Sequence, residues 1–110
     1  MSKTELVKGS TEVIILSLLS EQVMYGYELA QKIENESEGF LRFREGTLYP
    51  ALKKLETQGF VESYWRNSTE GPRRKYYKIT NTGKKALSGL INEWTAFQRV
   101  MNKIVGVSHG

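Results

Sequence analysis

The strongest constraint on the fold is an apolar repeat in the last quarter of the chain. Beyond Thr82, apolar residues recur at intervals of 3, 4, 3, 4 and 3, the spacing of a coiled-coil seam. Because the stripe continues for nearly three heptads, it predicts a helix of about 24 residues that ends near Val105 and packs on another helix. A chain of 110 residues has room for one core, so the stripe is predicted to be a dimer interface. The predicted interface residues are Leu87, Leu90, Trp94, Phe97, Met101 and Ile104.

Two shorter segments near the beginning of the chain predict helices. Residues Ser10–Leu19 begin with Ser-Thr-Glu, which favours a helix start with an acid in the first turn, and continue as an apolar block. Several residues of this block are β-branched, so periodicity alone leaves a buried strand as an alternative. The second segment starts at Glu28, where Leu29 and Ile33 lie one turn apart and the polar residues face outward. We expect a helix in both places.

A third helix is predicted between Thr47 and Gln58. Thr47 can cap it, and Pro50 is tolerated because the first turn needs no internal N–H partner. Gly59 suits a left-handed cap at the other end. A helical wheel separates two faces of this helix. Leu48, Ala51, Leu52 and Leu55 cluster on one side, whereas Tyr49, Pro50, Lys53, Lys54 and Thr57 occupy the opposite half.

The chain then changes to a pattern typical of a β-hairpin. Residues Phe60–Arg66 and Lys75–Thr80 are rich in aromatic and β-branched side chains, and the intervening Asn67–Arg74 is turn-forming. Basic residues concentrate around this turn, and Gly71 and Pro72 are expected at its tip. The aromatic residues of the strands are expected to pair across the hairpin and pack on the core rather than to stack on bases. They are Tyr64, Trp65, Tyr76 and Tyr77.

Charge is distributed unevenly along the chain. Residues 12–41 hold six acids and one base, whereas residues 42–78 carry nine bases against four acids. This local excess makes the third helix and the hairpin the part expected to face a polyanion. Lysines on a helix face can meet phosphates or guanine edges, and a basic hairpin can lie along a DNA backbone or enter the minor groove. The predicted DNA contacts are Thr47, Tyr49, Pro50, Lys53, Lys54, Arg73, Arg74 and Lys75.

Each of these contacts has a purely structural alternative. Lys53 and Lys54 could belong to an ordinary solvated helix face. Tyr49 and Pro50 could serve packing in the first turn. The charges of the hairpin could protect an exposed β edge from aggregation.

The order of the elements predicts the fold class. Three helices, a hairpin with a basic turn and a long helix follow one another as in a winged helix-turn-helix with an appended dimerisation helix. The fold is thus expected to be mostly α with a small β-hairpin, and the third helix to enter the major groove. Residues 1–80 would form the winged helix-turn-helix domain and residues 81–106 the dimerisation helix, in one compact unit.

Three sequence blocks, in this order, resemble the signatures of PadR-like transcriptional regulators. They are Tyr25–Leu29, Gly46–Gly59 and Gly71–Thr80, and the similarity extends over nearly the whole chain. The resemblance implies a winged-helix repressor that acts as a homodimer, binds a roughly palindromic operator in double-stranded DNA and is released by a small molecule. Many family members carry a larger C-terminal domain, whereas a single helix ending near Val105 is similar to the short, multidrug-sensing subgroup.

The resemblance to this short subgroup also implies a ligand site. There, the first and last helices of two subunits enclose a flat apolar pore in which paired tryptophans stack on planar drugs, and Trp94 falls at the matching position. Independently of the family, two copies of a seam residue approach each other across a dyad, and their rings could hold a planar hydrophobic small molecule. The alternative is that Trp94 fills the dimer core. The residues that the resemblance assigns to the pore are Glu12, Val13, Leu16, Ile91, Trp94, Thr95 and Gln98.

The residue inventory argues against an enzyme. The chain has no cysteine, which excludes disulfides, thiolate metal sites and cysteine nucleophiles, and its single histidine is His109. The sequence has no metal-ligand spacing, so no metal or other cofactor is expected. No apolar run is long enough to cross a bilayer, and Met1–Lys8 lacks the hydrophobic core of a signal peptide, which predicts a cytoplasmic protein.

A second class of function stays open. A winged-helix protein can dimerise through its long helix and act as a protein-interaction adaptor that does not bind DNA. The basic hairpin argues against this reading. Salt dependence separates a DNA-binding regulator from such an adaptor. In a plot of the logarithm of DNA affinity against the logarithm of salt concentration, a DNA-binding protein gives a slope of about −0.9 per phosphate contact.

Overall fold

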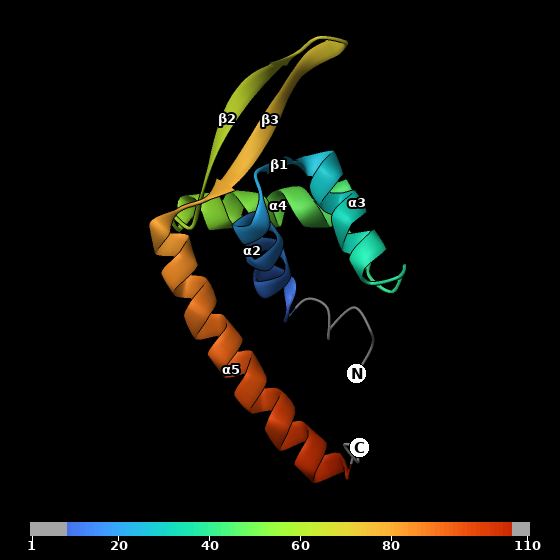
Figure 1. Cartoon of the computed structure of the whole chain (residues 1–110), viewed down its shortest axis with the longest axis vertical. Helices are drawn as coiled ribbons and strands as arrows, with labels where there is room; N and C mark the ends of the chain where they lie inside the picture. Colours follow the sequence, from blue (N-terminus) through green and yellow to red (C-terminus); the bar gives the residue numbers. More distant parts are fainter. Residues whose placement is uncertain (1–8, 107–110) are drawn as a thin grey trace.

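A computed structural model describes residues 9–106, and His109 lies outside this range. Helices come first, a hairpin follows, and a long helix ends the described part (Figure 1). This is the order predicted for a winged helix-turn-helix with an appended helix, and the apolar block that follows Ser10 is helical rather than a strand. The elements are α2 (Thr11–Glu21), β1 (Met24–Tyr25), α3 (Gly26–Glu36), α4 (Glu45–Thr57), β2 (Val61–Ser68), β3 (Gly71–Ile79) and α5 (Asn81–Val105).

The sheet contains one strand that the sequence pattern does not predict. β3 is central, with β2 on one side and β1 on the other, and both neighbours run antiparallel to it. β1 pairs Met24 with Tyr77 and Tyr25 with Tyr76. A strand of two residues is too short for an alternating pattern to be visible in the sequence. Its pairing attaches the hairpin to the connection between α2 and α3.

The hairpin of β2 and β3, called the wing below, has longer strands and a shorter turn than predicted. Pairing continues as far as Ser68 opposite Gly71. Only two residues remain between the strands, so the prediction of a connection over Asn67–Arg74 is wrong. Residues 73–75 therefore lie within β3, where successive side chains point to opposite faces of the sheet.

The core lies among α2, α3, α4 and the base of the wing. α5 joins it only through its first turns, where Leu87 is buried and Leu90 packs against the same cluster while partly buried. Leu87, predicted at a dimer interface, thus belongs to the core of its own protomer. The buried cluster consists of Ile15, Leu16, Leu19, Met24, Leu29, Ile33, Phe43, Leu48, Leu52, Leu55, Val61, Tyr77, Ile79 and Leu87.

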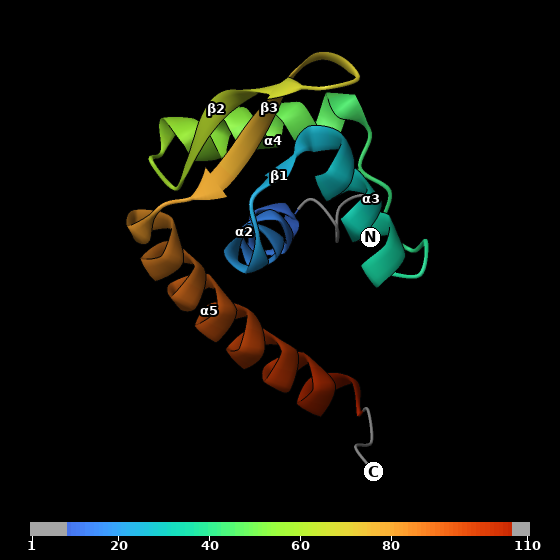
Figure 2. The same cartoon turned by 45° about the horizontal axis from the view of Figure 1, so that its top comes forward.

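α5 begins against the body of the protein and then leaves it. Thr80 caps the helix by accepting the Gly83 N–H at 2.9 Å, and the helix ends at Val105 as predicted. Figures 1 and 2 show its second half projecting away from the wing and from the other helices. Within residues 9–106, no helix combines the length and the apolar character that a membrane crossing requires.

Candidate nucleic-acid interface

α4, the predicted reading helix, starts earlier than the sequence suggests. It begins at Glu45 after the cap residue Arg44, and no side chain hydrogen-bonds at this cap. Thr47 is therefore the third residue of the helix, and the prediction that it caps the helix is wrong. Pro50 lies in the second turn, where it removes one internal backbone hydrogen bond. At the other end, Gly59 has the predicted left-handed conformation, with φ of 79°.

One side of α4 is open to solvent. Successive residues of an α-helix are rotated by about 100°. Pro50, Lys53 and Thr57 consequently lie opposite the packing side, and all three are exposed. Pro50 and Thr57 lie at the middle of this side, and Lys53 lies beside them toward the flank of Tyr49. The packing side consists of the buried residues Leu48, Leu52 and Leu55.

Tyr49 lies on the flank of α4 that faces α3 and β3. Its hydroxyl is so close to Gly26 that a Cβ at this position would collide with it, so the glycine permits the two helices to approach. Tyr49 nevertheless keeps 43% of its surface exposed, and it both packs and faces outward. Burial raises the pKa of the neighbouring Tyr77 hydroxyl, and Tyr49 and Glu56 add to the shift. Tyr77 thus stays uncharged beside the interface.

Thr47 and Lys54 lie on the other flank of α4, which faces the beginning of α2. Lys54 Nζ is 3.1 Å from Glu12 Oε1. A groove lies between α2, α4 and the connection that precedes α4. It is lined by Glu12, Lys54, Thr47 and Arg42, among others. The neighbouring lysines of α4 therefore differ, because Lys54 is held by a carboxylate on α2 and Lys53 lies on the open side.

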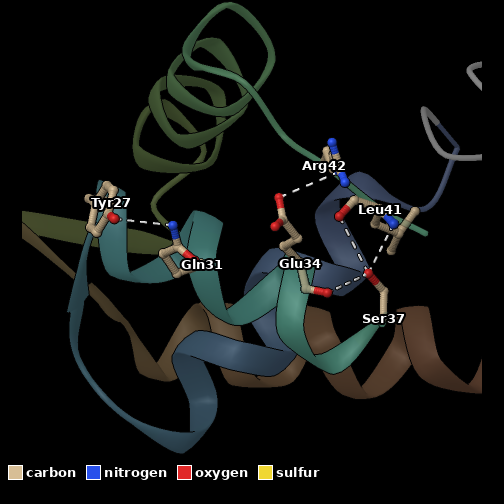
Figure 3. A network of polar contacts seen from close by, with 6 residues as sticks. All are labelled: Tyr27, Gln31, Glu34, Ser37, Leu41 and Arg42. Carbon is tan, nitrogen blue, oxygen red and sulfur yellow. Dashed lines mark hydrogen bonds and ion pairs between the residues drawn. The ribbon is translucent and has the colours of Figure 1, made fainter. Parts of the chain in front are cut away.

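The connection between α3 and α4 is braced by side chains (Figure 3). Ser37 Oγ accepts the Leu41 N–H at 2.9 Å and donates to the Glu34 carbonyl oxygen at 3.2 Å. The Glu34 carboxylate also lies 3.7 Å from the guanidinium of Arg42. These contacts fix the direction in which the chain enters α4. They also give Arg42 a structural partner, which the sequence did not reveal.

On the face of the wing that continues from the core, two cations lie against aromatic rings. The Arg73 guanidinium is 5.2 Å from the centroid of Trp65. The Lys75 ammonium is 5.8 Å from the centroid of Tyr77, whose ring is buried. Cation–π contacts of this kind hold long side chains in place without neutralising them. Both cations thus keep their charge for a polyanion.

The opposite face of the wing carries a second set of stacked side chains. Arg74 lies 4.6 Å from the ring centroid of Tyr25, and Arg66 lies 5.2 Å from that of Tyr76. Tyr64 stacks on Tyr76 at 6.0 Å, which confirms the predicted cross-strand pairing for these two residues. The prediction is wrong for Trp65, which lies opposite Lys75 and is exposed rather than packed on the core. Arg66 and Arg74 are directly opposite in the register, so these rings keep two like charges apart. The contact between Tyr25 and Arg74 could not be predicted, because β1 has only two residues and shows no alternating sequence pattern.

The residues predicted for a ligand pore are divided between different places. Val13, Ile91, Trp94 and Thr95 line an apolar groove of about 610 Å³ between α2, the end of α3 and α5. Glu12 faces α4 instead, in the groove that contains Lys54. Leu16 is fully buried in the core and lines neither groove. Gln98 is exposed on α5 and lines neither of these two grooves.

The residues predicted for a dimer interface divide along α5. Leu87 and Leu90 pack on the body of the protomer. The remaining four, on the projecting part of the helix, are exposed, together with further apolar side chains. The exposed apolar residues of α5 are Ile91, Trp94, Phe97, Val100, Met101, Ile104 and Val105.

The comparison with known proteins decides the family. Residues 15–89 match the family described as the Transcriptional regulator PadR-like family. The matched segment is more than half of the chain. The chain belongs to this family. This PadR-like protein is accordingly a DNA-binding transcription regulator, and its relatives are regulators rather than enzymes.

Solved structures and curated sequences resemble this PadR-like regulator over most or part of its length. A transcriptional regulator from Clostridium thermocellum has a TM-score of 0.85 and 38% identity, over 92% of this chain and 98% of that one. A PadR family transcription regulator from Clostridium difficile R20291 has a TM-score of 0.77 and 38% identity, over 87% and 98% of the two chains. The negative transcriptional regulator PadR of Bacillus subtilis is 32% identical over 66% of this chain and 40% of its own.

Proposed function

We propose that this regulator is a homodimeric repressor that binds a palindromic operator through α4 and the wing. The observation that carries the proposal is the unpaired apolar side of α5, on which Phe97 is 63% and Ile104 is 72% exposed. A contiguous apolar stripe of this length is stable in water when a second helix covers it. Repression, rather than activation, is supported by the relative from Bacillus subtilis, which is described as a negative transcriptional regulator.

The open side of α4 and the wing supply the DNA contacts in this proposal. Lys53 meets phosphates or base edges, and Tyr49, Thr47 and Pro50 contact the backbone or a thymine methyl group. The wing adds cations from β3, of which Arg73 and Lys75 share the face that continues from the core. Two copies of α4 about 34 Å apart fit successive major grooves on one side of B-DNA. The proposed contact residues are Thr47, Tyr49, Pro50, Lys53, Lys54, Arg73, Arg74 and Lys75.

Removal of single cations tests this assignment. Lys53→Gln and Arg73→Gln are each expected to make the salt dependence of DNA binding shallower by about 0.9 per protomer, because each loses one phosphate contact. The measurement is fluorescence anisotropy with a DNA fragment from upstream of the regulator's own coding sequence. Lys103→Gln is the matched control, since it removes one charge at the far end of α5. Equal slopes for all three variants would contradict the assignment, and no binding at low salt would favour the adaptor function.

An effector site is the second part of the proposal. The groove lined by Val13, Ile91, Trp94 and Thr95 is apolar and lies where a second protomer would meet the exposed side of α5. Two Trp94 side chains across a dyad could hold a planar hydrophobic molecule by stacking. Such a molecule releases DNA only if it binds better to a dimer whose α4 helices are misaligned.

Fluorescence of Trp94 tests the effector site. In a Trp65→Phe variant, Trp94 is the sole tryptophan, and a planar acridine dye is expected to quench it in a saturable manner. The same dye should weaken DNA binding of this variant and leave that of Trp94→Leu unchanged. Unquenched fluorescence at dye concentrations that weaken DNA binding would show that the dye acts elsewhere, for example on the DNA.

A further inference from the structure

The ion pair between Glu12 and Lys54 joins the start of α2 to the reading helix. Their charged atoms are 3.1 Å apart, and the side chains are 31% and 67% exposed. The other ion pairs within residues 9–106 are Lys32 with Glu36 and Arg42 with Glu34. Among the cations of α4 and the wing in this range, Lys54 is therefore the one held by a carboxylate.

The direction of Lys54 follows from its place in α4. Lys53 and Lys54 are rotated by about 100° from each other, so they cannot both occupy the middle of the open side. They lie on either side of that middle, Lys53 toward the flank of Tyr49 and Lys54 toward α2, where Glu12 meets it. Glu12 is in the first turn of α2, and the positive end of the helix dipole favours a negative charge there.

We propose that Glu12 is a positioning residue for DNA binding: it holds Lys54 on the α2 side, away from phosphate, and thereby lowers the affinity of the regulator for DNA. An exposed ion pair of this kind changes an equilibrium constant by a factor of roughly two to five. A phosphate must overcome this factor to recruit Lys54. Lys54 then contacts DNA only when a phosphate displaces it from Glu12.

The proposal rests on DNA binding by the family and on neither the dimer nor the effector. It differs from a purely structural role in one measurable respect. A structural ion pair affects the stability of the fold, whereas a pair that competes with phosphate changes the number of counterions released on DNA binding. The slope of affinity against salt therefore separates the two roles.

The experiment uses the full chain and a fluorescein-labelled duplex of about 30 base pairs of random sequence, from about 50 to about 300 mM salt. Glu12→Gln keeps the size of the side chain and removes its charge. It is expected to tighten binding by about two- to fivefold per protomer and to steepen the salt slope by about 0.9 per protomer. Both changes are expected to disappear when Glu12→Gln is combined with Lys54→Gln, because the released cation is then missing.

Two comparisons make the result decisive. Glu36→Gln breaks the pair with Lys32 on α3 and is expected to leave the slope unchanged. Thermal unfolding establishes that each variant is folded. An unchanged slope in folded Glu12→Gln would overturn the proposal, and so would an equal increase in the Lys54→Gln background, since Glu12 would then act only through its own charge.

Discussion

Gly83→Ala is expected to lower the free energy of unfolding by about 2–3 kcal/mol, the cost of forcing a methyl group into a well-packed site. Gly83 is buried in the first turn of α5, and a Cβ there would overlap the carbonyl oxygen of Phe60 and come within 2.8 Å of Ile79 Cγ1. The Phe60 carbonyl cannot yield easily, because it accepts the Thr80 N–H at 3.0 Å. Urea denaturation followed by circular dichroism measures the change.

Gly89→Ala is the matched control for this prediction. It lies in the same helix, and nothing in the protomer is within 4 Å of the Cβ that would be added. Alanine is better than glycine inside a helix by roughly 0.5–1 kcal/mol, so this variant should be more stable than the parent protein. If Gly83→Ala were equally stabilising, the close contact between α5 and Phe60, in the connection from α4 to β2, would not exist in solution.

Phe97→Asp is expected to convert the proposed dimer into monomers and to weaken binding to the proposed operator by about 100-fold or more. Phe97 is on the projecting part of α5, and a buried carboxylate without a partner at the centre of an apolar interface is strongly unfavourable. Loss of the second reading helix then removes the gain in affinity that comes from linking two half-sites. Sedimentation equilibrium and a gel shift with the upstream fragment measure the two effects.

Asn92→Asp adds the same carboxylate to the opposite side of α5, where the residue is exposed. This variant is expected to stay dimeric and to bind DNA nearly as well as the parent protein. A Phe97→Asp protein that remained dimeric would show that the subunits meet elsewhere. A monomer with undiminished operator binding would contradict the proposed two-site geometry.

The sequence could predict α5 and its apolar side but not how that side is used. Leu87 and Phe97 belong to the same stripe with the same spacing, yet the first is buried in its own protomer and the second is exposed. Periodicity reports which residues share a face of a helix. Whether that face meets the same chain or another depends on where the helix leaves the body, which is a tertiary property. Leu16, which the family resemblance assigns to the pore, is fully buried in the protomer, and burial is likewise a tertiary property.

The turn of the wing was predicted at the wrong residues, because residues typical of turns lie within a strand. Gly71 and Pro72 are typical turn residues, but they lie at the beginning of β3, and the turn itself is formed by Thr69 and Glu70. The register of β2 and β3 shifts between Arg66 and Ser68, opposite Gly71–Arg74, so the face on which Arg73 lies is known from its contact with Trp65 and not from the sequence. The Glu12–Lys54 pair could not be predicted, because it joins residues from two helices that are far apart in the sequence.

In the proposed dimer, the division of α5 into a packed half and a projecting half makes folding of the projecting half depend on protein concentration. A segment as short as the one from Trp94 to Val105 is marginally stable as an isolated helix in water. In the proposed dimer, winding of this segment and association of the subunits are therefore one event, governed by protein concentration. When few copies are present, single protomers would carry an unwound tail that proteases can cut. Degradation of the regulator would then be fastest at low concentration. Repression would therefore change more steeply with the amount of regulator in the cell.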